Sequence, residues 1–190
     1  MNRRIIMGTL LMAACIAMAV TAIAYGDRHE WDGEEEGGLF ARTADIAPVT
    51  SKLYANECGA CHFAYQPGWL PARSWQHIMD TLDDHFGENA ELDDQERREI
   101  TRYLVANAAD RASRPQSRWV LRSLDGKEPP MRISELRYIR HEHDEIPGRL
   151  IEGNPGVRSR SNCQACHTQA DKGFFDEHSV SIPGYGYWDD

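Results

Sequence analysis

Cys58-Gly59-Ala60-Cys61-His62 is the most informative stretch of this 190-residue chain, and it recurs once as Cys163-Gln164-Ala165-Cys166-His167. The C-x-x-C-H spacing of both stretches is typical of c-type haem attachment. Two thiols bond to the two vinyl groups of one porphyrin, so they must lie about one helical turn apart. The adjoining histidine ligates the iron from its proximal side. We therefore predict two covalently bound haem c groups, anchored by Cys58, Cys61, Cys163 and Cys166 and ligated by His62 and His167.

A zinc site, a thioredoxin-like motif or a pair of disulfides would fit the paired cysteines less well. Two C-x-x-C pairs can form a four-cysteine zinc ribbon, but such pairs are usually separated by roughly 15–20 residues. Here Cys61 and Cys163 lie 102 positions apart. A thioredoxin-like motif has a single C-x-x-C in a βαβ context. Two disulfides would leave the two following histidines without a role.

Residues 1–24 are predicted to be a signal peptide and not part of the fold. Arg3 and Arg4 supply the positive start, residues 5–24 form an apolar run of 20 residues, and Ala22-Ile23-Ala24 resembles a cleavage site. An uncleaved anchor is the alternative, because 20 apolar residues are just long enough to span a bilayer. Both interpretations place the haem-binding part of the chain in the periplasm.

The charge of the chain limits the kind of partner. The formal net charge is −9, and it becomes −11 when residues 1–24 are removed with their two arginines. This charge argues against binding to nucleic acid or to an anionic membrane surface, and it favours a partner with a basic docking face. Because six acidic residues fall between Asp27 and Glu36, we interpret residues 25–48 as an acidic flexible tether.

Residues 49–112 are predicted to form a class I cytochrome c-like helical domain around the first haem. A short helix is expected to lead into the first C-x-x-C-H. Apolar residues at helical spacing predict a second helix from the N-cap Ser74 to a C-terminal Gly87. A third helix is expected from the N-cap Asp93 to about Asp110.

Residues 113–190 are predicted to form a second haem domain that is loop-rich and irregular. Prolines and glycines interrupt the periodicity of this part. One helix is expected over residues 134–145, and apolar side chains of residues 174–183 are expected to wrap the second haem. The domain boundary is placed within residues 111–117. The chain as a whole is thus expected to be mainly α-helical.

The second axial position of each iron decides whether the site carries electrons or binds ligands. For the first haem, His85 shares the apolar face of the expected helix with Leu82, whereas His77 falls on the polar face. Met79 also lies on the apolar face, but methionine at helical spacing usually packs in a core. His85 is therefore our predicted distal ligand of the first iron.

For the second haem, His143 is the predicted distal ligand. It lies four residues after Ile139, on the expected inward side of a helix. His141 and His178 are the remaining candidates, whereas His29 belongs to the acidic segment.

The simplest pairing of these ligands sets one haem in each half of the chain. His85 would face His62, and His143 would face His167. Two histidines on each iron would make both haems electron carriers. A crossed pairing, in which each half supplies a ligand to the other half's haem, stays open.

A resemblance to a known family rests on six blocks of sequence. They are ECGACHFAY (57–65), LPARSW (70–75), DHFG (84–87), YLVANAAD (103–110), HDEIP (143–147) and NCQACH (162–167). With these blocks the chain resembles the small periplasmic dihaem cytochromes c called DHC. The members of that family are partners of a high-spin oxygen-binding cytochrome, the sphaeroides haem protein, and of a membrane cytochrome b. The resemblance implies a class I-like first half, an irregular second half, two low-spin bis-His haems and low-potential electron transfer.

The predicted function is electron transfer between a membrane-bound donor and a soluble haem-protein acceptor, with no catalytic residue. A dihaem peroxidase is the enzymatic alternative, and it needs one open iron position with a distal acid or base beside it. The small dihaem subunit of a periplasmic reductase is a further alternative. Its haem sites are expected to lie closer together in sequence than those of this chain.

Overall fold

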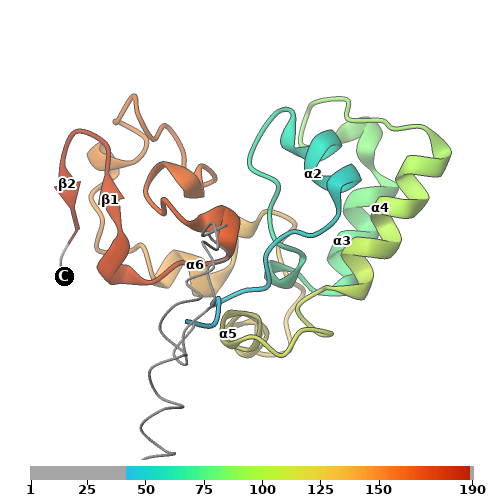
Figure 1. Cartoon of the computed structure of the whole chain (residues 1–190), viewed down its shortest axis with the longest axis horizontal. Helices are drawn as coiled ribbons and strands as arrows, with labels where there is room; N and C mark the ends of the chain where they lie inside the picture. Colours follow the sequence, from blue (N-terminus) through green and yellow to red (C-terminus); the bar gives the residue numbers. More distant parts are fainter. Residues whose placement is uncertain (1–41, 189–190) are drawn as a thin grey trace, which may run out of the picture. The chain divides into compact units, whose positions relative to one another are not determined.

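The structure is a computed structural model that describes residues 42–188, and this part is mainly helical, as predicted (Figure 1). Its α-helices are α2 (Lys52–Gly59), α3 (Ala72–Asp80), α4 (Asp94–Ala106), α5 (Pro115–Leu124) and α6 (Arg137–His141). Short 3-10 helices cover Pro67–Trp69, Leu82–Asp84, Ile133–Glu135, Gly148–Leu150, Cys163–Ala165, Ala170–Lys172 and Glu177–Ser179. The strands β1 (Ser181–Ile182) and β2 (Gly186–Tyr187) pair antiparallel, with Ser181 opposite Tyr187.

Helices α2, α3 and α4 gather on one side of the described part, and they form the class I-like first half (Figure 1). Apolar side chains of α3 and α4, among them Trp75, Met79 and Leu104, are buried in one common cluster. Helix α4 begins at the predicted N-cap, because the Asp93 carboxylate accepts hydrogen bonds from two backbone N–H groups of its first turn. The last turn of α2 carries the first cysteine of the first motif.

The second helix predicted from the sequence, with Ser74 as its N-cap and Gly87 at its end, has wrong bounds at both ends. Helix α3 begins at Ala72 with Pro71 as its N-cap, and Ser74 is buried inside the helix. It ends at Asp80, because Thr81 leaves helical geometry and turns its hydroxyl back to the carbonyl of His77. His85 therefore lies beyond the end of α3. The argument that predicted it as a ligand, a shared helical face with Leu82, does not apply to its position.

Residues 42–48 contradict the tether predicted over residues 25–48. Ile46 is fully buried, and its N–H donates to the carbonyl of Gly173. A side chain at position 173, where φ is +82°, would collide with the Ile46 carbonyl, so glycine is required there. The rest of the predicted tether and the predicted leader lie outside the described residues.

Helix α5 was missed in the sequence, although Pro115 at its first turn is a recognised helix-start signal. Its Ser117 is buried and donates a hydrogen bond to the Gly68 carbonyl at 2.9 Å. The main buried cluster runs from Ile46 to Leu136. The predicted domain boundary at residues 112–113 thus falls inside this cluster, and α5 packs with the first half.

The second half is irregular, as predicted, and has a small buried cluster of its own. Ile151, Val157, Val180 and Ile182 form that cluster. The helix expected over residues 134–145 is shorter than predicted, since only Arg137–His141 is α-helical. Across residues 42–188, no helix is long and apolar enough to cross a membrane.

Candidate haem sites

The first site is built at the end of α2. Ser51 caps the start of this helix, because its hydroxyl accepts a hydrogen bond from the N–H of Tyr54. The cap fixes the start of α2, and Cys58 lies in its last turn. Cys58 is partly buried, and burial raises the pKa of its thiol to about 11. Cys61 is exposed, and the His62 ring that follows is hydrogen-bonded through Nδ1 to the Phe63 carbonyl at 2.8 Å. That bond leaves the Nε2 atom of His62 as the nitrogen available to a metal.

His85 faces His62 from a tight turn that follows α3. Its N–H donates to the Glu88 carbonyl at 2.7 Å, and the N–H of Gly87 donates to the Asp84 carboxylate at 3.0 Å. Phe86 between them has a φ of +59°, which is unusual for a bulky residue and marks a constrained turn. The turn thus holds the His85 ring in one position.

The two rings of this first pair are nearly parallel. The centroids of the His62 and His85 imidazoles lie 6.2 Å apart, and their planes are 16° from parallel. Two imidazoles on opposite sides of one metal, each with a metal–nitrogen bond of about 2.0 Å, have centroids about 6 Å apart. The measured separation therefore fits one iron between the two rings.

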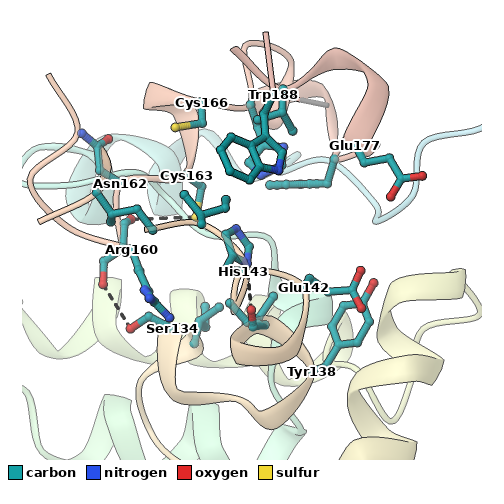
Figure 2. Close-up of a pocket in the computed structure, with 18 of the residues that line it drawn as sticks. Ser134, Tyr138, Glu142, His143, Arg160, Asn162, Cys163, Cys166, Glu177 and Trp188 are labelled. Atoms are coloured by element: carbon teal, nitrogen blue, oxygen red, sulfur yellow. Dashed lines mark hydrogen bonds between the residues drawn. The ribbon is translucent and has the colours of Figure 1, made fainter. Parts of the chain in front are cut away.

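The second site is built from the Cys163–Ala165 turn, α6 and the C-terminal segment. The N–H of Ser181 donates to the Cys166 carbonyl at 3.0 Å, so the strand region closes over the motif. His143 follows α6, and its Nδ1 is hydrogen-bonded to the Ile139 carbonyl at 2.7 Å. Figure 2 shows the His143 ring directed into the pocket beneath Cys163.

His143 and His167 form the second pair. Their ring centroids lie 6.1 Å apart, again the separation of two imidazoles on one metal, but their planes cross at 72°. Burial and the neighbouring His143 lower the pKa of His167 to about 4. Burial, followed by His62 and Arg132, also lowers the pKa of His85. Both shifts favour the neutral imidazole, which is the form that ligates a metal.

A cavity of about 500 Å³ contains the second pair, and its size is within the range of cofactor pockets, roughly 300–1,000 Å³. Its lining includes both cysteines of the motif and both histidines, with Tyr138, Phe175 and Trp188 as apolar walls. Trp188 and Tyr138 are seen on either side of His143 in Figure 2. Another cavity, of about 430 Å³, lies beside His85 and is lined by Ile78, Phe86, Met131 and Arg132.

Alternative uses of the four motif cysteines do not match the structure. No disulfide joins any of these four cysteines. Within the described part of the chain, no group of three or more His, Cys, Asp or Glu side chains is arranged to hold a metal ion. The two pairs of cysteines therefore do not form a four-cysteine zinc site, and each pair stands with its own pair of histidines.

The pattern of the dihaem cytochrome c family, DHC, matches residues 54–175 of the chain. The chain belongs to the dihaem cytochrome c family. Among solved structures, this dihaem cytochrome is similar to a diheme cytochrome c from Rhodobacter sphaeroides, with 46% identity and a TM-score of 0.61 over 68% of this chain and 100% of that one. It is also similar to a diheme cytochrome c from Shewanella baltica, with 41% identity and a TM-score of 0.60 over 73% of this chain and 97% of that one. No curated protein matches the chain.

Membership in the family means that this dihaem cytochrome carries two covalently bound haem c groups, as predicted. The family is one of electron transport. The residues present fit both groups, because each C-x-x-C-H lies beside a pair of imidazoles with the spacing of two ligands on one iron. The individual roles of the four cysteines, and of His62, His85, His143 and His167, stay predictions that this geometry supports.

The structure brings the predicted ligands together without crossing the two halves of the cytochrome. Of the other candidates, Met79 is buried in the main cluster. His141 and His178 also line the second cavity, but their side chains are exposed beside Asp144 and Glu177. His29 lies outside the described residues.

Sequence reasoning missed two residues that shape the sites of the dihaem cytochrome. Arg132 lies over the Phe86 ring, with its guanidinium 4.0 Å from the ring centroid, and lines the cavity beside His85. Tyr65 packs against His62, and burial raises the pKa of its phenol to about 12. Arg132 carries no local signal in the sequence. Tyr65 follows the first motif by three positions, which could have indicated contact with that site.

Proposed function

We propose that this dihaem cytochrome is an exported electron carrier in which each iron is held by two histidine side chains. The observation that carries the proposal is the agreement between the two ring separations, 6.2 Å and 6.1 Å, and the spacing of two imidazoles on one metal. Bound haem supplies one-electron chemistry at its iron. The protein orients the imidazoles through the Phe63 and Ile139 carbonyls and covers the second site with Trp188.

The proposed ligand set favours electron transfer at low potential. A methionine ligand raises the potential of a c-type haem, so a second histidine in its place lowers it. Met79 is 2% exposed and belongs to the main buried cluster, which supports its exclusion as a ligand. Both haems would then be low-spin in both oxidation states, and little rearrangement would accompany each transfer.

The proposed partners are a membrane-bound donor, a cytochrome b, and a soluble oxygen-binding haem protein as acceptor. The resemblance to the DHC family supports these partners. Charge supports a basic face on one of them: residues 80–99 carry nine acidic and two basic side chains, and this segment contains His85. Asp83, Asp84 and Glu88 in the turn are all exposed. A basic partner would be steered toward this acidic turn and the first haem.

Stopped-flow oxidation tests the proposal. The dithionite-reduced protein is mixed with a ferric, strongly basic monohaem cytochrome c as a probe acceptor, at low and at high ionic strength. We expect oxidation of both haems, with a second-order rate that falls steeply as salt is added. A rate that does not change with salt would contradict docking through the acidic turn. Failure of one haem to be oxidised would contradict the carrier function.

A peroxidase function makes a different prediction. It requires an iron position that peroxide can reach, whereas the proposed ligand set fills both positions of each iron. Turnover of hydrogen peroxide by the reduced protein with an external electron donor would favour the enzymatic alternative. A reductase subunit would be favoured by co-purification with a large molybdenum-containing subunit.

A further inference from the structure

The charge of the dihaem cytochrome is distributed unevenly along the chain. Residues 111–140 carry eight basic and three acidic side chains, a net charge of +5, whereas the rest of the chain carries −14. No acidic residue occurs within residues 111–124, which include four arginines. This basic segment can attract an anionic surface locally, although the net charge of the whole chain would repel it.

Helix α5 exposes two of these arginines and a tryptophan. Arg118 and Arg122 are exposed, and their spacing of four positions places them on one face of the helix. Trp119 lies beside them, because the guanidinium of Arg122 is 5.0 Å from the centroid of the Trp119 ring. Ser117 and Val120 of the same helix are buried. We call the surface formed by Arg118, Trp119 and Arg122 the basic face of α5.

The arginines of the basic face keep their charge unpaired among the described residues. The ion pairs of this region join Arg73 to Glu128 and Arg132 to Glu135. Across residues 42–188, no arginine of α5 forms an ion pair. The positive charge of the basic face is therefore available to an external partner.

Further positive charge lies near the basic face. Lys127 follows the end of α5 and is exposed. Helix α6 packs against α5 and exposes Arg137 and Arg140. The positive charge thus extends over two helices, and this breadth matches an extended anionic surface better than it matches a single carboxylate group.

Trp119 has no part in the haem sites. It is 51% exposed, and it lines neither of the two cavities beside the histidine pairs. A tryptophan ring suits the boundary between lipid and water, because most of the ring is apolar while its N–H can stay hydrated. An exposed tryptophan beside two arginines therefore indicates a surface that meets lipid headgroups.

We propose that the basic face of α5 binds the anionic headgroups of a phospholipid membrane. The guanidinium groups of Arg118 and Arg122 can each donate two parallel hydrogen bonds to phosphate oxygens. The Trp119 ring lies at the level of the headgroups in this arrangement. An acidic protein is the alternative partner, but the breadth of the positive charge favours the membrane. The inference adds a surface to the proposed electron carrier and does not depend on the ligands of either iron.

Membrane binding through α5 gives the cytochrome a defined orientation. The acidic residues 80–99 surround the start of α4, and the basic segment begins after the end of α4, where Figure 1 shows α5. Helix α4 has 13 residues and is about 20 Å long, so opposite charges lie toward its two ends. An anionic membrane attracts the end with α5 and repels the end with the turn that contains His85. The first haem thus faces away from the membrane, toward a soluble partner.

Vesicle binding tests the basic face. The haem-loaded protein is sedimented with vesicles of phosphatidylcholine alone, or of equal parts phosphatidylcholine and phosphatidylglycerol, at low and at moderate salt. The bound fraction is read from the Soret absorption of the haem. The contribution of an uncleaved leader would be the same in every variant, so a comparison among variants isolates α5.

Two variants with the same change of charge are compared. Arg118→Gln combined with Arg122→Gln removes both arginines of the basic face. Arg98→Gln combined with Arg102→Gln is the matched control, because these exposed arginines also lie four positions apart, on α4. A third variant, Trp119→Ala, removes the ring without a change of charge. The visible spectrum and the haem content show whether each variant is folded.

We expect the wild type to bind the anionic vesicles, with binding that weakens as salt is added. Binding should be about ten-fold weaker or more in the α5 double variant, and close to that of the wild type in the α4 control. Trp119→Ala should bind several-fold more weakly, with an unchanged dependence on salt.

Equal loss of binding in the two double variants would overturn the proposal. Absence of binding to the anionic vesicles at low salt would also overturn it, and it would leave the basic face to an acidic protein partner. Because the assay involves no electron transfer, its failure would be distinct from a failure of the carrier function.

Discussion

His62 and His85 face each other with ring planes 16° from parallel, whereas His143 and His167 face each other with planes crossing at 72°. The centroid separations of the two pairs differ by only 0.1 Å, from 6.2 to 6.1 Å. The two sites therefore offer the same ligands at the same spacing but in different orientations. The His143 orientation is set by its hydrogen bond to Ile139, and the His85 orientation by the turn around Phe86.

This difference predicts two distinct electron paramagnetic resonance signals from the oxidised protein. Each imidazole donates π electrons into the iron d orbital perpendicular to its ring. Parallel rings raise one such orbital, whereas perpendicular rings raise two by similar amounts and leave them close in energy. We expect a rhombic signal from the first haem and a more axial signal with a larger maximum g value from the second. Two identical rhombic signals would contradict the ring geometry.

Replacement of each distal histidine should open one iron. In His85→Ala and in His143→Ala, we expect carbon monoxide to bind about half of the reduced haem, because one of two irons loses a ligand. His141→Ala is the matched control, since this exposed histidine lies two positions from His143 and pairs with Asp144. Visible spectra of the reduced proteins with and without carbon monoxide measure the effect. A His143→Ala protein that behaves like the control would remove His143 from the site.

Loss of the Arg132 charge should lower the potential of the first haem. Arg132 stands beside His85 and Phe86, and a nearby positive charge disfavours the ferric state, which carries the additional positive charge. One charge contributes on the order of 1 kcal/mol at an effective dielectric of about 20, or roughly 40 mV for one electron. Screening reduces this value, because the Arg132 side chain is 47% exposed.

A redox titration of Arg132→Gln should therefore show a fall of a few tens of millivolts in one of the two potentials. Arg137→Gln in α6 is a suitable control, since this arginine has no ring contact with Phe86 and does not line the cavity beside His85. An unchanged pair of potentials, or an equal shift of both, would contradict a local effect of Arg132 on the first haem.

Asp176 should make stability depend on pH in the acidic range. The hydrogen bond from Arg42, at 2.8 Å, and a second from Ser179 hold the pKa of Asp176 below its ordinary value of 3.8. Because the pKa is depressed in the folded state, this stabilisation is present above pH 3.8 and is lost as the pH falls through the lower folded-state pKa.

Denaturant unfolding of the wild type and of Asp176→Asn checks this effect. We expect the variant to be modestly less stable at neutral pH, and the difference should shrink once the pH is well below 3.8. Asp171→Asn is a nearby control for which no ion pair is formed in the described part of the chain. A stability difference that stays constant with pH would mean that the charge of Asp176 is not responsible.

Much of the haem chemistry could be predicted from the sequence, because covalent attachment demands a fixed local spacing. The two C-x-x-C-H motifs are local patterns, and so is the Asp93 cap of α4. His85 was selected for a reason that the structure does not support, since it lies in a turn after α3 and not on the face of a helix. The sequence block that contains His85, residues 84–87, is short. Only the tertiary fold brings His85 opposite His62.

The rest depends on contacts between distant parts of the chain. Residues 42–48 look like the end of an acidic segment, but the burial of Ile46 against Gly173 is decided by the second half. Arg132 and Tyr65 act across the two halves, and no local pattern indicates their partners. Helix α5 could have been found from Pro115, which stands at its first turn.

The central claim is that each iron of this dihaem cytochrome holds two protein imidazoles, and carbon monoxide tests it most directly. The visible spectrum of the native, dithionite-reduced protein is recorded before and after addition of the gas. We expect no change, because carbon monoxide needs an open or weakly held iron position. A shift of the spectrum in about half of the haem would show that one pair of histidines does not ligate its iron, and it would contradict the proposed carrier.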